Sequence, residues 1–297
     1  MVESSRRGDS KIACVSSFPL AALSNSDTTM NGRRWQTAPM RQNRISPPFS
    51  HCLLLALFSV TAFAQGPTTE VILPGDARVD GSIIRAATNA WKMTGTSPGG
   101  RRTDGGVWRD KIELVERSGL TIIRRTQLDS GPEGTTTFIT ETDQKKLTPI
   151  LAEVTTPGGF HRVWKFESDH VHSVVNAPSK PGEAARTRES DIAISQPVFD
   201  FDGGMFGLLV AGFPLQENFS AKFPVFDPRN GVAWATYTVI GRERVPAGKK
   251  RPIEAWTVEV RDPVRLARMI FSLTKEPPCV IRLQEAGEGM FWVFDMI

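Results

Sequence analysis

Apolar and polar residues alternate with a period of two through most of the chain from residue 107 onward. Successive side chains of a strand point to opposite faces, so this pattern is typical of strands with one buried face. Clusters of Gly, Pro, Asp and Ser separate the runs and predict turns between neighbouring strands. The predicted strands are 107–116, 120–128, 136–142, 147–155, 160–166, 171–175, 191–195, 219–226, 233–241, 253–261, 269–274, 280–285 and 290–294.

So many short strands predict a mainly β fold. We expect a curled antiparallel sheet or a partly open β-barrel of about a dozen strands, because curling protects edges that an open sheet would expose. One or two short helices complete the prediction. Residues 77–91 show helical spacing, although 90–94 could instead be a first strand. Residues 203–215 are apolar and rich in Gly, and predict a short helix or apolar loop that covers the opening of the sheet.

Residues 40–64 have the pattern of a secretory signal peptide. Arg41 and Arg44 precede an apolar run over 52–63, and Ala62 and Ala64 give the A-x-A spacing of a cleavage site. We therefore expect a periplasmic protein whose mature chain starts at Gln65. The apolar run is shorter than the ~20 residues of a spanning helix, so we expect no membrane span.

This signal divides the chain into three parts. Residues 1–39 are expected to be a disordered extension or the product of a start codon assigned too early. Residues 40–64 are the signal peptide, and 65–297 form a single exported β-domain whose N-terminal part, 65–106, has the less regular pattern.

The charge of the chain changes once the signal is removed. The whole sequence carries 36 basic and 32 acidic side chains. Residues 1–64 hold seven of the basic and three of the acidic ones, which leaves 29 of each in the remainder. A formally neutral domain does not favour nucleic acid as a partner.

Cysteine usage and known motifs limit the possible chemistry. Of the three cysteines only Cys279 lies beyond residue 64, so the mature chain has no internal disulfide, and Cys279 is expected to be a buried apolar residue. Sequence motifs of hydrolases, phosphate-binding loops and C-x-x-C redox sites are absent. We therefore predict no catalytic residues and no cofactor.

The order of several short motifs in the second half of the chain resembles a family of exported bacterial β-proteins of unknown function. Their fold is similar to that of the periplasmic lipoprotein carrier and the outer-membrane lipoprotein receptor. The motifs are at 199–202, 213–215, 237–243, 246–248, 255–260, 274–278 and 280–283. This resemblance implies a curved sheet partly closed around an apolar interior, with a helical segment over the open side, and implies no catalytic residues.

Large apolar side chains at alternating positions are the candidates for a ligand-binding interior. We expect them to bind an apolar small molecule, a lipid or an acylated protein. An ordinary packed core explains the same residues, in which case the chain is an envelope scaffold or interaction protein. The candidate lining residues are Trp164, Phe166, Phe206, Leu209, Phe213, Trp234, Trp256, Phe271 and Trp292. The sequence predicts neither the ligand nor the oligomeric state.

His170 and His172 provide an alternative site. Residues two apart on a strand share a face, so both imidazoles could bind one Zn²⁺ in a metal-dependent hydrolase. His161, Glu167 or Asp169 would supply a third ligand. Two polar residues on the solvent-exposed face of a strand explain the same pattern.

Overall fold

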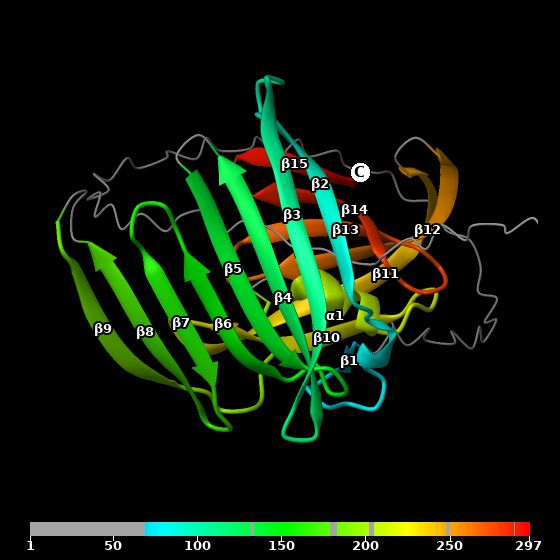
Figure 1. Cartoon of the computed structure of the whole chain (residues 1–297). Helices are drawn as coiled ribbons and strands as arrows, with labels where there is room; N and C mark the ends of the chain where they lie inside the picture. The colour runs from blue at the N-terminus through cyan, green and yellow to red at the C-terminus, as the bar shows by residue number, and fades with distance from the viewer. Residues whose placement is uncertain (1–68, 132–133, 179–182, 202–204, 248–249, 288) are drawn as a thin grey trace, which may run out of the picture. The chain divides into compact units, whose positions relative to one another are not determined.

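The computed structural model describes residues 69–131, 134–178, 183–201, 205–247, 250–287 and 289–297. They form a single curled sheet of 15 strands that does not close on itself (Figure 1). Two short helices, η1 (Gly81–Ile83) and α1 (Phe206–Gly212), accompany the sheet. The signal peptide at 40–64, the cleavage point before Gln65 and the 1–39 extension lie outside the described residues and stay predictions. The strands are β1 (Glu70–Val71), β2 (Ala87–Thr96), β3 (Arg102–Arg117), β4 (Leu120–Gly131), β5 (Gly134–Asp143), β6 (Pro149–Thr155), β7 (His161–Phe166), β8 (His170–Pro178), β9 (Ala185–Ala193), β10 (Ser220–Asp227), β11 (Gly231–Ala247), β12 (Lys250–Asp262), β13 (Ala267–Leu273), β14 (Val280–Gly287) and β15 (Met290–Met296).

The sheet consists of two meanders that meet in its middle. From β2 to β9 each strand pairs antiparallel with the next, and β9 forms one edge of the sheet. The chain then crosses to the other edge, where β1 lies parallel to β10. From β10 the second meander returns until β15 pairs with β2. We call β2 to β9 the first half of the sheet and β10 to β15 the second half.

The mainly β fold expected from the alternating pattern is confirmed, including the short link between the predicted strands 107–116 and 120–128. Ser118 and Gly119 form this link with positive φ values of 52° and 79°. Two such residues make the tight hairpin turn that matches the right-handed twist of its strands, and glycine adopts that conformation without strain.

Of the two alternatives for 77–94, the strand is confirmed and the helix over 77–91 is not. Only η1 is helical there, and β2 begins at Ala87. Trp91 fits helical spacing from Ala87, but it also fits the alternation in which Asn89, Trp91 and Met93 are buried. This segment forms a strand because it pairs with β3 on one side and β15 on the other, which satisfies its backbone hydrogen-bonding groups.

The strand predicted at 191–195 overlaps a longer strand that begins earlier. Strand β8 extends to Pro178, and β9 begins at Ala185. All residues of β9 except Ile192 are exposed, so the strand has no buried face and shows no alternation in the sequence. Its charged side chains are typical of edge strands, where they discourage pairing with other chains.

The apolar segment at 203–215 does contain a helix. Helix α1 contacts η1, β13 and β14, and its Leu208, Leu209 and Val210 are buried. Figure 1 shows α1 behind the strands of the first half, in front of the second half. The helix therefore packs on the inside of the curl.

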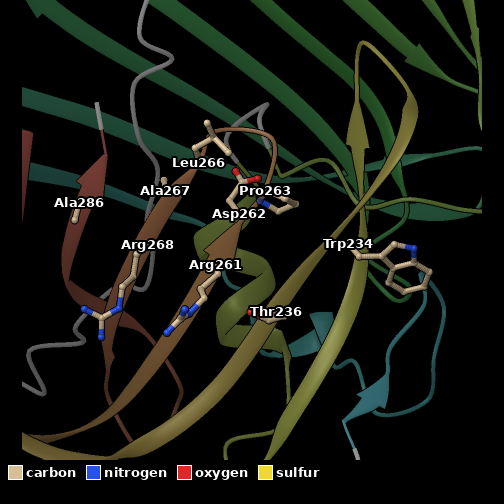
Figure 2. Close-up of a pocket in the computed structure, with 9 residues that line it drawn as sticks. All are labelled: Trp234, Thr236, Arg261, Asp262, Pro263, Leu266, Ala267, Arg268 and Ala286. Carbon is tan, nitrogen blue, oxygen red and sulfur yellow. The ribbon is translucent and has the colours of Figure 1, made fainter. Parts of the chain in front are cut away.

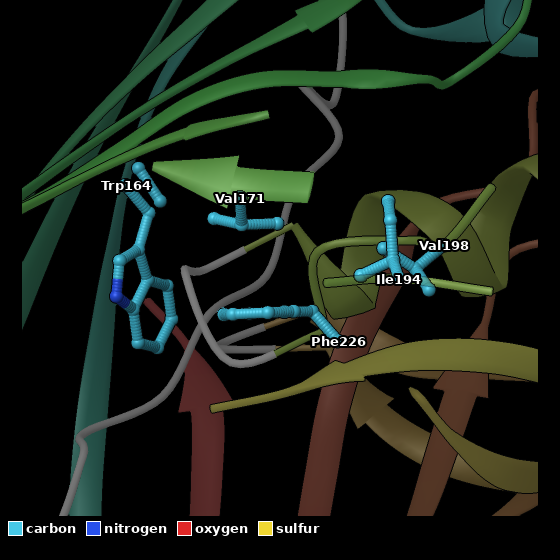
Figure 3. Packing of buried hydrophobic residues seen from close by; sticks show 6 residues of the cluster. Trp164, Val171, Ile194, Val198 and Phe226 are labelled. Atoms are coloured by element: carbon cyan, nitrogen blue, oxygen red, sulfur yellow. The ribbon is translucent and has the colours of Figure 1, made fainter. Parts of the chain in front are cut away.

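Side chains join the two ends of the sheet. Trp164 and Val171 of the first half pack with Phe226 of β10 and with Ile194 and Val198 of the crossing segment (Figure 3). The rings of Trp164 and Phe226 meet edge to face at 4.9 Å. We call this group the seam cluster. Among the described residues it links the β7–β8 region to β10 without backbone pairing between them.

Candidate functional site

The predicted lining residues of the first half are packed against other side chains. Trp164 is buried and Phe166 is half-buried, and both rings contact Phe226 in the seam cluster. The guanidinium of Arg162 lies 3.5 Å from the centre of the Trp164 ring. These two candidates therefore form part of a packed core.

The candidates near α1 belong to a second packed group. Leu209, Phe213 and Phe271 are each at most 3% exposed. The Phe213 ring lies 5.2 Å from Phe223 and 5.3 Å from Tyr237, centre to centre. The side chain of Phe206 lies outside the described part of the chain.

The three tryptophans of the second half lie in different surroundings. Trp256 is 7% exposed, with the guanidinium of Arg242 4.2 Å above its ring. Trp292 is half-buried and lies next to Gly95 and Gly105, where an added Cβ would come within 2.8 Å of its ring. Trp234 is 42% exposed. The lining as a whole stays a prediction.

The inner face of the first half carries several buried polar side chains among its apolar ones, which the sequence prediction missed. We use inner face for the face that carries Trp108, Ile112 and Trp164. Cross-strand register places Asn89, Asp110 and Gln127 in one row on β2, β3 and β4. Arg125 and Thr140 share the next row with Ile112. All five polar side chains are at most 9% exposed.

An ion pair lies at the centre of this face. Arg125 donates from Nε to Asp110 Oδ1 and from Nη2 to Oδ2, both at 2.8 Å, and both side chains are fully buried. Burial raises the pKa of Asp110, against the attraction and hydrogen bonds of Arg125 and a smaller effect of the Trp91 indole. Burial also lowers the pKa of Arg125, against its attraction to Asp110.

Four N–H donors around Asp110 form no hydrogen bond of ordinary geometry within the protein. They are Nδ2 of Asn89, Nε1 of Trp91, Nε1 of Trp108 and Nε2 of Gln127. The Trp91 indole acts as a nearby donor that lowers the pKa of the Asp110 carboxyl, but the contact does not have the geometry of an ordinary hydrogen bond. An unsatisfied buried donor costs about 1–3 kcal/mol, so four of them are a large fraction of a domain's stability. We call these four residues the donor patch.

A second candidate site is a pocket on the surface of the second half. It has a volume of about 400 Å³ and a mostly apolar lining, formed where the turn between β12 and β13 approaches β11 (Figure 2). Leu266 is 84% exposed and adopts a positive φ of 52° in that turn. Trp234 and Leu266 give the pocket its two large exposed apolar side chains. Its lining residues are Trp234, Thr236, Arg261, Asp262, Pro263, Leu266, Ala267, Arg268 and Ala286.

Two arginines form the polar rim of the pocket. Nε of Arg261 and Nε of Arg268 each donate to Glu259 at 2.6 Å. Burial alone would raise the pKa of Glu259, but these two guanidinium groups outweigh it and lower the pKa. Glu259 is 13% exposed, whereas Arg261 and Arg268 are 67% and 57% exposed. A molecule that approaches the rim therefore meets guanidinium donors first.

His170 and His172 lie on one face of β8, as predicted, and the fold brings Asp191 of β9 to them. His172 Nδ1 is 2.7 Å from Asp191 Oδ1, and His170 Nε2 is 4.0 Å from the same oxygen. His170 also pairs with Asp169, which raises the pKa of the imidazole. The searched residues contain no group of three or more side chains arranged to hold a metal ion. The zinc site stays a prediction without geometric support.

Both the donor patch and the surface pocket depend on register and hairpin placement. The sequence contained a signal for the donor patch. Asp110 lies in the same alternating phase of β3 as Trp108 and Ile112, so it belongs to the buried face. For the pocket no such signal exists, since Trp234 and Leu266 come from different hairpins.

Comparisons with known proteins add a family to this description. In the described residues no helix is both long and apolar enough to cross a membrane. Neither the curated proteins nor the solved structures contain a match to the chain. A family model described as a protein of unknown function, DUF3108, matches residues 99–293, which cover β3 to β14 completely. With a match over most of its length, this chain belongs to the DUF3108 family.

Proposed function

We propose that this chain is an exported envelope protein that binds a segment of a partner protein at the Trp234–Leu266 pocket. The single observation behind the proposal is the contrast between interior and surface. The interior candidates Trp164, Phe213 and Phe271 are packed against other side chains. Trp234 and Leu266 instead remain exposed around a hollow of about 400 Å³.

The pocket fits an apolar side chain followed by a carboxylate. Trp234 and Leu266 offer apolar area, and removal of such area from water supplies affinity. Arg261 and Arg268 lie beside them, and arginine binds carboxylates through paired hydrogen bonds. The partner segment would place a Leu or Phe in the pocket and a Glu or Asp on the rim.

The charges beneath the rim shape this interaction. Glu259 is paired with both rim arginines, and Asp262 is buried in the pocket wall. The local charge is therefore close to balanced, and recognition relies on short-range hydrogen bonds from the guanidinium groups. Binding should lose little affinity between low and moderate salt, in contrast to strongly charged interfaces.

A binding experiment with defined peptides tests the proposal. The probes are acetylated hexapeptides with a central Phe-Glu pair, with Phe-Gln and Ala-Glu versions, titrated calorimetrically into the purified protein. We expect the Phe-Glu peptide to bind most tightly, and Trp234→Ala to weaken it at least tenfold. Phe291→Ala, at an aromatic residue that is 40% exposed outside the pocket lining, is the matched control and should bind normally.

The same experiment tests the alternative expected from the sequence, in which the protein binds an apolar ligand. Decanoate, which joins an acyl chain to a carboxylate, is titrated in parallel. If decanoate binds tightly and no peptide binds, the occupant of the pocket is a lipid and not a partner protein. Absence of saturable binding of both would refute the role of the pocket.

A further inference from the structure

The donor patch is not explained by the surface pocket. Asn89, Trp91, Trp108 and Gln127 lie on the inner face of β2, β3 and β4, whereas the pocket is lined by residues of β11 to β14 and the β12–β13 turn. Each of the four side chains is at least nine-tenths buried. Each also carries an N–H group that forms no hydrogen bond of ordinary geometry within the protein, although the Trp91 indole is close enough to Asp110 to lower its pKa.

Register brings these donors close to one another. Asn89 and Gln127 lie directly opposite Asp110 on its two neighbouring strands. Trp91 and Trp108 lie opposite each other in the adjacent row. Directly opposed residues have Cβ atoms about 5 Å apart, and successive residues on one face of a strand are about 7 Å apart. The four N–H groups therefore belong to one compact patch.

The protein itself offers too few hydrogen-bond acceptors for the donors of this patch. The nearest carboxylate, Asp110, already accepts two hydrogen bonds from Arg125. The indole of Trp108 stacks on Phe138, with ring centres 5.5 Å apart and planes 15° from parallel. This stacking fixes the ring, so its N–H cannot turn to a protein acceptor without breaking the contact.

We propose that the donor patch is a binding site for a small uncharged molecule that presents a carbonyl oxygen. Buried donors without partners are satisfied when an acceptor occupies the space before them. An anion would be buried next to Asp110, while the Arg125 guanidinium is already engaged by that carboxylate. A neutral acceptor avoids this repulsion, and the flat indole surfaces suit a planar amide or ester group.

The patch lies near the rim of the sheet. Asp129 lies opposite Trp108 on β4 and is only half-buried, and the next residues, Ser130 and Gly131, are exposed. Burial raises the pKa of Asp129, which favours its uncharged form beside the site. The patch is thus one residue pair away from solvent at the end of β4.

Indole N–H signals in proton–nitrogen NMR spectra of the purified full chain test this site directly. The probe is N,N-dimethylacetamide, which has a carbonyl acceptor and no donor. The Trp91 and Trp108 signals are assigned with Trp91→Phe and Trp108→Phe. We expect both signals to shift downfield in a saturable way as the probe is added. The Trp234 signal is the internal control and should stay in place.

Variants separate binding from a structural effect. Gln127→Met keeps the shape of the side chain and removes its donor, and we expect at least tenfold weaker binding. Gln284→Met, at a half-buried position of β14, is the matched control and should bind like the wild type. Trp234→Ala should also bind the probe normally, so failure of the pocket and failure of this site are distinguishable.

Two results would overturn the proposal. One is the absence of saturable shifts at Trp91 and Trp108 in a protein whose Trp234 signal and dispersion show that it is folded. The other is equal or tighter binding of acetate, the anionic counterpart of the probe, which would contradict the assignment of an uncharged ligand.

Discussion

Asp110 and Arg125 form a doubly hydrogen-bonded ion pair with no exposed side-chain surface, two residues apart in the register between β3 and β4. Removal of one partner leaves the other charge buried without compensation. We expect Asp110→Asn to lower the free energy of unfolding by about 3–5 kcal/mol. Urea denaturation followed by tryptophan fluorescence measures this change.

The double variant Asp110→Leu, Arg125→Met distinguishes the pair's net contribution from the cost of breaking it. Removal of both charges also removes both desolvation penalties, so the double variant should be more stable than Asp110→Asn. A double variant that is less stable than the single variant would contradict this account of the pair.

Asp129 makes stability depend on pH. Burial raises the pKa of its carboxyl in the folded state above the ordinary value of about 4. The folded protein therefore binds this proton more tightly than the unfolded chain, and its stabilising effect is present at low pH and lost as pH rises through the raised pKa. Asp129→Asn should abolish that loss, so the variant gains stability relative to wild type above this range.

A control with the opposite sign is available at Asp104. Its pKa is lowered, chiefly by a hydrogen bond from Lys92, so its contribution is lost as pH falls. Thermal melts of wild type, Asp129→Asn and Asp104→Asn over a pH series measure both effects. Parallel pH profiles for wild type and Asp129→Asn would show that Asp129 titrates normally.

A substitution at Phe226 tests whether the seam cluster stabilises the curl of the sheet. Its ring packs against Trp164 and Phe166 in the seam cluster and is 2% exposed. Phe226→Ala should lower the free energy of unfolding by about 3–5 kcal/mol. Hydrogen exchange should rise most in β7, β8 and β10, because β10 does not pair with β7 or β8 and the side chains of this cluster hold them together.

Phe291→Ala removes a ring that is 40% exposed and should change stability by less than about 0.5 kcal/mol. Exchange that rises evenly through the sheet in Phe226→Ala would mean that the seam does not open independently of the rest.

The alternating pattern predicted most of the sheet, because strands with one buried face repeat every two residues. It located only the end of β9, where only Ile192 is not exposed, and left a helix or a strand open at β2, where Trp91 fits both spacings equally. The polar inner face was accessible in part. Asp110 lies in phase with Trp108, but its partner Arg125 is known only from the register of β3 with β4. Registers and hairpin contacts are properties of the whole sheet and are absent from any local pattern.

Tyr237, the only tyrosine of the chain, allows a direct measurement of core integrity. Its hydroxyl donates to the Pro214 carbonyl at 3.1 Å, and its ring packs against Phe213 and Phe219. Burial raises the pKa of the phenol above its ordinary value of about 10. The folded protein holds this proton more tightly than the unfolded chain, so stability falls as pH rises beyond that value.

An alkaline titration should show phenolate absorbance only together with loss of the β-sheet circular dichroism signal. Phenolate formation in a protein that keeps its sheet would place Tyr237 in contact with solvent and contradict the packing around α1. Tyr237→Phe should lose about 1 kcal/mol for the missing hydrogen bond and show no phenolate band at any pH.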